Sequence, residues 1–196
     1  MPHAKKGAIV ILHEIYGINA HIRRICDIWQ ARGFEVFIPA LFPHEAPFSY
    51  AQEEEAYHHF MRHTGFETTP VITLLNKLKI HYSMVFVVGY SVGATLAWLA
   101  ARSGRCEGVI CHYGSRIRQY SDIAPTCPAL MIIARHESGF DTGIMQRKLD
   151  KFPSVQSYMF DAHHGFCDAD SSAFDDNLAR QAHDKAWGFI KRIIHR

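Results

Sequence analysis

The sequence is poor in cysteine, in net charge and in long apolar runs, and each shortage excludes a class of protein. Its five cysteines are an odd number with no Cys-x-x-Cys pair, which argues against a disulfide framework and favours reduced thiols in a cytoplasmic protein. A formal net charge of +2 is too small to indicate a nucleic acid or an anionic membrane surface as partner. No apolar run is long enough to span a bilayer.

The sequence also lacks linkers, internal repeats and low-complexity tracts. Its 196 residues, 48% of them hydrophobic and 20% charged, are typical of one globular domain with a sizeable core. Only six residues precede the first apolar run, which leaves no room for a signal peptide. We therefore expect a single domain over residues 1–196.

What the sequence does contain is a regular alternation of two patterns. Short apolar, β-branched runs predict strands at 7–12, 34–38, 84–88, 107–113, 129–134 and 155–160. Between and after them, helical spacing predicts helices at 19–32, 51–63, 68–80, 93–104, 143–152 and 172–194, the first capped by Asn19 and the last by Ser172. Such alternation requires crossover connections, so we expect an α/β fold with about six mainly parallel strands and helices on both faces.

One pentapeptide between a predicted strand and a predicted helix indicates chemistry. Gly89-Tyr90-Ser91-Val92-Gly93 has the Gly-x-Ser-x-Gly pattern of a nucleophile elbow. In that motif the chain turns sharply from strand to helix, and the serine is held above the sheet at the positive end of the helix. A structural glycine-rich turn is the alternative interpretation.

A serine hydroxyl needs a neighbouring base, and its partners are expected on loops after later strands. The loop after the last predicted strand contains His163 and His164, and either one is a candidate base. The loop after the strand at 129–134 contains Glu137 and Asp141, and either carboxylate is a candidate to orient that histidine.

Three motifs together resemble the dienelactone hydrolase family of the α/β-hydrolase superfamily. They are His-Glu-Ile-Tyr-Gly-Ile-Asn at 13–19, the pentapeptide at 89–93 and His-Gly-Phe at 164–166, and the segment 33–42 also matches. The resemblance extends from about Gly7 to the end of the chain. It implies an α/β-hydrolase fold with Ser91 as nucleophile and His164 as base. By the same resemblance the backbone N–H groups of Ile15 and Val92 form an oxyanion hole, and Glu14 matches a glutamate beside the nucleophile.

The sequence departs from the family pattern at several of these positions. Ser91 stands where the type enzymes have cysteine, and Glu137 is in register with the usual aspartate, with Asp141 four residues later. Asp168 replaces an arginine that binds a substrate carboxylate in the type enzyme. We therefore expect a substrate that lacks this carboxylate or holds it differently.

These observations lead to one functional prediction and one alternative. The prediction is hydrolysis of a small-molecule ester, lactone or thioester through an acyl-serine intermediate, by an enzyme that needs neither metal nor cofactor. The alternative is a catalytically silent α/β-hydrolase scaffold that binds a small molecule or a protein, which the unusual acid position favours.

Overall fold

The structure, a computed structural model, describes residues 7–43 and 46–195 and contains one six-stranded sheet. The strand order is β2-β1-β3-β4-β5-β6, and every neighbouring pair is parallel. The expected absence of a signal peptide concerns residues 1–6, which lie outside the described residues. The strands are β1 (Ala8–Leu12), β2 (Glu35–Phe37), β3 (Val85–Tyr90), β4 (Gly108–His112), β5 (Ala129–His136) and β6 (Val155–His163).

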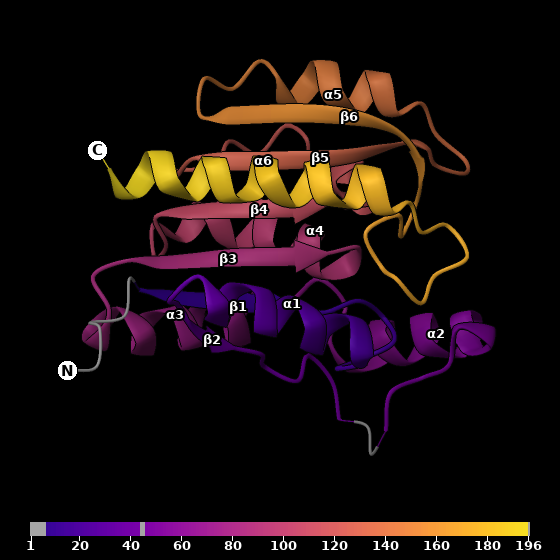
Figure 1. The fold of residues 1–196 in the computed structure, drawn as a ribbon, viewed down its shortest axis with the longest axis horizontal. Coiled ribbons are helices and arrows are strands. Elements are labelled where there is room, and N and C mark those ends of the chain that lie inside the picture. Colours follow the sequence, from indigo (N-terminus) through magenta and orange to yellow (C-terminus); the bar gives the residue numbers. More distant parts are fainter. Residues whose placement is uncertain (1–6, 44–45, 196) are drawn as a thin grey trace.

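Helices cover both faces of this sheet, as predicted. Helices α1 (Ala20–Ala31) and α6 (Asp176–Ile194) lie on the face that is turned to the viewer in Figure 1. The opposite face packs against α2 (Glu53–His63), α3 (Thr69–His81), α4 (Val92–Ala100) and α5 (Thr142–Leu149). The carboxyl ends of the parallel strands point to one edge of the molecule, which is where ligands bind in such sheets.

Two apolar cores, one on each face, explain why the inner strands read as continuous apolar runs. Along β1, Ile9 and Ile11 pack with α1 and α6, whereas Val10 and Leu12 pack with the helices of the other face. Successive side chains of a strand point to opposite faces, so a strand covered on both sides has no polar position. All residues of β1, β3 and β4 are buried accordingly.

Strands β5 and β6 are longer than predicted at their carboxyl ends. They continue to His136 and His163, and these two residues pair with each other beyond an irregularity in the register after Ala134. The apolar runs end at Ala134 and Phe160, so the sequence predicts loops for the polar residues that follow. Their pairing places Glu137 and His164 directly after neighbouring strands, at the same edge of the sheet.

The predicted caps of the first and last helices had different outcomes. Asn19 caps α1 as predicted, and its side chain accepts a hydrogen bond from the backbone of Ile22 at 3.1 Å. The prediction of Ser172 as cap of the last helix is wrong, because Asp175 caps α6 and accepts from the backbone of Leu178 at 2.9 Å. The residues before Asp175 form turns rather than helix, and the Asp175 N–H donates to the carbonyl of Phe166.

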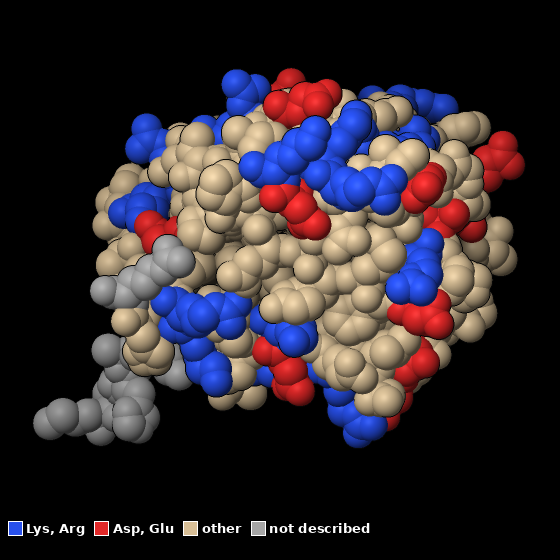
Figure 2. Space-filling view, turned by 90° about the horizontal axis from the view of Figure 1, so that it is seen from above, with Lys and Arg blue, Asp and Glu red and all other residues tan. Residues whose placement is uncertain are grey.

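Charged side chains are distributed without separation by sign on the face shown in Figure 2. Blue basic groups and red acidic groups are interspersed among uncharged residues there. Among the described residues, no helix is both long and apolar enough to cross a membrane.

Candidate active site

The chain turns sharply at Ser91, between the end of β3 and the start of α4. Ser91 has a φ of 54°, which side chains rarely adopt, and its side chain stands at the N-terminus of α4. A Cβ atom on Gly89 would lie 2.2 Å from the carbonyl oxygen of Gly93, and one on Gly93 would lie 2.1 Å from that of Leu12. Both glycines are therefore required by the close approach of three backbone segments, which is the reason for the Gly-x-Ser-x-Gly pattern.

The structure brings Ser91, His164 and Glu137 into one hydrogen-bonded chain. The Ser91 Oγ and His164 Nε2 atoms are 2.9 Å apart, and His164 Nδ1 lies 2.6 Å from Glu137 Oε1. The Glu137 side chain is 9% exposed and the His164 side chain 37% exposed, so the carboxylate is covered while the imidazole is open to a ligand. This is the arrangement of a nucleophile, a base and an orienting acid.

The other two candidates from the sequence lie apart from this chain. Asp141 caps α5, and its Oδ1 atom accepts from the backbone N–H groups of Gly143 and Ile144 at 2.8 and 3.2 Å. His163 is the last residue of β6, and its ring lies beside that of His136, with ring centroids 5.0 Å apart. Of the two histidines and two carboxylates that the sequence left open, only His164 and Glu137 belong to the hydrogen-bonded chain that includes Ser91.

Acidic neighbours determine how basic His164 is. Burial, the largest single cause, lowers the pKa of His164, and the hydrogen bond and charge of Glu137, together with the charges of Glu14 and Glu53, raise it. The net result is a pKa above the ordinary value of histidine. The charged imidazolium is thus stabilised, which suits a group that takes up a proton from a hydroxyl.

Two backbone N–H groups beside Ser91 are available to an oxygen atom of a ligand. Ile15 and Val92 both line the same cavity as Ser91. Val92 is the first residue of α4, where an N–H has no acceptor within its helix. Neither N–H donates to another residue of the described chain. The two groups expected as an oxyanion hole are thus unengaged at the cavity wall.

The cavity above Ser91 has a volume of about 840 Å³, which is suited to a small molecule. Glu53 and Tyr57 of α2 line it, as do Arg116 and Arg118 of the 3₁₀ helix η3 (Ser115–Gln119). The sequence patterns did not predict either arginine as part of the site. Their only signal was their place in the connection that follows β4, since that strand ends at the same edge of the sheet as β3.

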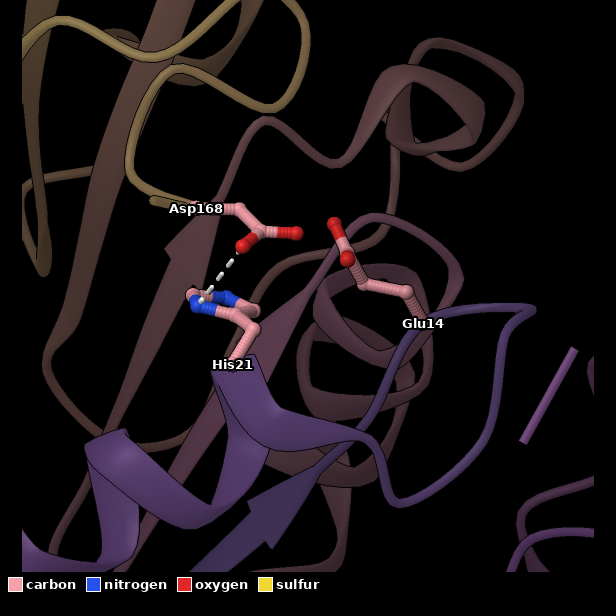
Figure 3. Close-up of side chains that lie close together, drawn as sticks. All are labelled: Glu14, His21 and Asp168. Carbon is pink, nitrogen blue, oxygen red and sulfur yellow. Dashed lines mark ion pairs between the residues drawn. The ribbon is translucent and has the colours of Figure 1, made fainter. Parts of the chain in front are cut away.

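Glu14 is buried beside the site with its carboxylate facing that of Asp168 (Figure 3). Burial raises the pKa of Glu14 to about 7; the charge of His164 lowers it and that of Asp168 raises it. The side chain makes no hydrogen bond to another described residue. Glu14 therefore changes its charge near neutral pH and, through its field, affects His164.

Asp168, which stands at the position of the family arginine, is 2% exposed and engaged by several donors. The Tyr50 hydroxyl donates to its Oδ2 atom, and the backbone N–H of Asp170 donates to Oδ1 at 2.9 Å. Arg24 Nη2 lies 3.5 Å from Oδ1, and His21 Nδ1 lies 3.7 Å from it, as the dashed line in Figure 3 marks. Asp168 thus links the segment before α2 to the loop between β6 and α6.

Glu14, His21 and Asp168 are also the one group of potential metal ligands among the described residues. One donor atom from each lies within 4.8 Å of the others, and all three residues are buried. Both oxygens of Asp168 already accept hydrogen bonds from protein groups. Asp168 is thus held by Tyr50 and the backbone of Asp170, which are outside the group of potential ligands.

Comparison with known proteins gives a consistent result along the chain. A model of the dienelactone hydrolase family matches residues 1–194. The protein YczH of Bacillus subtilis (strain 168) is 33% identical over 176 residues, covering 88% of this chain and 87% of its own length. The carboxymethylenebutenolidase of Pseudomonas putida is 25% identical over 203 residues, which cover 95% of this chain and 86% of that protein's length. The fold matches Est1E of Butyrivibrio proteoclasticus, solved with ferulic acid, with a TM-score of 0.72 at 13% identity over 100% of this chain and 94% of that one.

Proposed function

The chain belongs to the dienelactone hydrolase family, and on that premise we propose that it is a serine hydrolase that cleaves an ester, lactone or thioester through an acyl-serine intermediate. The observation that carries the proposal is the continuous hydrogen-bonded chain from Ser91 through His164 to Glu137. Relatives support the substrate class, since one is a carboxymethylenebutenolidase and one fold neighbour was solved with ferulic acid.

In the first half of the reaction, Ser91 attacks the carbonyl carbon of the substrate. His164 takes the hydroxyl proton at Nε2 as the Oγ–C bond forms, and Glu137 holds Nδ1 and stabilises the imidazolium. The N–H groups of Ile15 and Val92 then donate to the oxyanion of the tetrahedral intermediate, a contribution of about 3–4 kcal/mol per donor when measured by removal. His164 returns the proton to the leaving oxygen or sulfur, which departs and leaves the acyl-serine.

In the second half, water replaces the leaving group. His164 removes a proton from the water as its oxygen attacks the acyl carbon, and the same N–H groups stabilise the second oxyanion. Collapse of this intermediate breaks the bond to Ser91, which recovers its proton from His164. The products are a carboxylic acid and an alcohol or thiol, or a hydroxy acid from a lactone.

The test is covalent labelling by a fluorophosphonate, followed by intact mass measurement. We expect one adduct on the native chain and none on Ser91→Ala. Ser138 also lines the cavity but makes no hydrogen bond to His164, so Ser138→Ala is the matched control and should still be labelled. An unlabelled native chain would favour the alternative of a silent binding scaffold, and labelling of Ser91→Ala would exclude Ser91 as the nucleophile.

A further inference from the structure

We propose that Arg116 and Arg118 form an anion subsite in the catalytic cavity, so that the substrate carries a carboxylate or a similar anionic group besides its scissile bond. This inference rests on the proposed function, because it concerns what the same cavity binds. It assigns a specificity role to two residues on the β4 side of the cavity, away from the position of Asp168.

Neither arginine has a carboxylate partner among the described residues, in contrast to three arginines elsewhere in the chain. Arg24, Arg135 and Arg180 each lie within 3.9 Å of an aspartate oxygen. No ion pair joins Arg116 or Arg118 to an acidic residue in the part of the chain that the structure describes. Both are partly buried in a wall of the cavity, where an unpaired cation is costly unless a ligand or solvent offsets its charge.

Aromatic and backbone contacts hold both guanidinium groups in place. Arg116 Nη2 donates to the Tyr57 hydroxyl at 2.7 Å. Arg118 Nη1 donates to the carbonyl of Ser115 at 2.6 Å, and its Cζ atom lies 4.4 Å from the ring centroid of Phe140. Each of these hydrogen bonds uses one of the five N–H donors of a guanidinium. The remaining donors are positioned before a ligand arrives, which favours bidentate binding of a planar carboxylate.

The short helix that carries the arginines is itself fixed next to the nucleophile. The carbonyl of His112, at the end of β4, accepts a hydrogen bond from the Ser91 N–H at 2.9 Å. Ile117, between the two arginines, is fully buried, and a Cβ atom on Gly114 would lie 2.6 Å from its Cδ1. The subsite therefore has a constant position relative to Ser91, as a specificity-determining group requires.

Acidic groups on other walls limit where an anion is accepted. Glu14, Asp168 and Asp170 line the same cavity from segments outside η3 and α2, whereas Glu53 lines it from α2, four residues before Tyr57. An anionic group placed near them meets repulsion, whereas one placed beside Arg116 and Arg118 meets two cations. This division of charge is consistent with a substrate that holds its carboxylate differently from the type enzyme's.

The experiment compares matched pairs of esters in which a carboxylate of one member is a neutral methyl ester in the other. One pair places the charge in the acyl group: 4-nitrophenyl hydrogen glutarate against methyl 4-nitrophenyl glutarate. The other places it in the leaving group: 4-acetoxybenzoate against methyl 4-acetoxybenzoate. We expect kcat/KM to favour the anionic ester by about tenfold or more in one pair, the gain typical of a hydrogen bond to a charged group.

The variants connect that preference to the two arginines. In Arg116→Gln and Arg118→Gln the ratio of kcat/KM for the anionic ester to kcat/KM for the neutral ester should fall by about tenfold. In Arg116→Lys and Arg118→Lys this ratio should be intermediate, since lysine keeps the charge but loses the planar fork. Arg180→Gln, an exposed arginine on α6, is the matched control and should keep the native ratio.

The outcomes separate this inference from the proposed function. Turnover of the neutral esters without preference for an anion in either pair, or a preference that survives both glutamine variants, would overturn the anion subsite alone. Absence of turnover of all four esters, together with absence of fluorophosphonate labelling, would overturn the proposed function instead.

Discussion

Two histidines, His164 after β6 and His112 at the end of β4, have opposite acid–base properties. The His112 side chain is completely buried, stacks on Tyr90 with ring centroids 4.4 Å apart, and has no hydrogen-bond partner for Nε2 among the described residues. Burial and two other histidines lower its pKa well below the ordinary value, whereas the pKa of His164 is raised. Burial alone makes histidine a weaker base, and a carboxylate partner reverses that effect.

The largest expected effect separates the two histidines by function. His164→Ala should lower kcat by about 10⁶-fold, because it removes the proposed base, and should change the free energy of unfolding little. His112→Ala should lower the free energy of unfolding by about 2–4 kcal/mol, because it leaves a cavity, and should lower kcat less than tenfold. Ester hydrolysis and urea unfolding measure the two quantities. A comparable loss of kcat in both variants would invalidate the contrast.

The second prediction concerns Glu137, the carboxylate that bonds to His164 and that His112 lacks. Glu137→Gln should lower kcat by about 10⁴-fold, since the amide neither stabilises the imidazolium nor favours the correct tautomer. Asp141→Asn is the matched control, and because Asp141 caps α5 it should affect stability by about 1 kcal/mol or less and leave kcat near the native value. If Asp141→Asn were the slower enzyme, Asp141 rather than Glu137 would be the orienting acid.

The third prediction concerns stability in mild acid. Burial lowers the pKa of His13, His21 and His183 to about 4 and that of His112 well below its ordinary value, whereas the pKa of Glu14 is raised to about 7. Below about pH 6.5 the unfolded chain binds protons at these histidines and the folded chain does not, so stability falls as the pH falls. Between about pH 4.5 and 7 the folded chain binds more protons at Glu14 than the unfolded chain does. Glu14 therefore raises stability as the pH falls, which offsets the loss from one histidine.

Three uncompensated histidines correspond to a loss of roughly 4 kcal/mol per pH unit between pH 6 and 5. Urea unfolding at pH 7, 6 and 5 measures this slope. His183→Gln should reduce the slope by about 1.4 kcal/mol per pH unit, because glutamine does not titrate, while the exposed His81→Gln should leave it unchanged. A stability that does not change between pH 7 and 5 would contradict the expected protonation states.

The smallest expected effect is a change in the pKa of His164 when a nearby acidic charge is removed. Glu14→Gln removes a charge that raises the pKa of His164, so the acidic limb of the pH profile of kcat/KM should shift to lower pH by up to about one unit. Glu53→Gln should give a smaller shift in the same direction. An acidic limb that does not move would mean that Glu14 is uncharged when the free enzyme titrates.

The sheet and the nucleophile turn were predictable because their signals are local. Burial on both faces produces continuous apolar strands, and the backbone contacts of Gly89 and Gly93 produce the pentapeptide pattern. The proximity of Glu137 to His164 was predictable in part, since both residues follow strands, although the sequence left Asp141 as an alternative. The structure separates the two carboxylates, because the Asp141 side chain caps α5 and bonds to the backbone of that helix, whereas Glu137 bonds to His164.

The rest of the site depends on contacts between segments far apart in the sequence. Arg116 reaches the cavity because α2 supplies Tyr57, 59 residues earlier in the chain. The Tyr50 hydroxyl meets Asp168 across 118 residues, and no periodicity in either segment indicates that pairing. Ser172 failed as a cap for the same reason, because the bond from Asp175 to Phe166 that delays α6 is formed by the folded loop.

The φ of 54° at Ser91 implies that selection has acted against stability at this position. A backbone in such a sparsely populated region costs on the order of 1–3 kcal/mol for any residue with a Cβ atom, and glycine would avoid most of that cost. A chain selected for stability alone would therefore drift toward glycine at position 91. Retention of a side chain at this strained turn marks a trade-off, in which the fold gives up stability so that one hydroxyl stays fixed above the sheet.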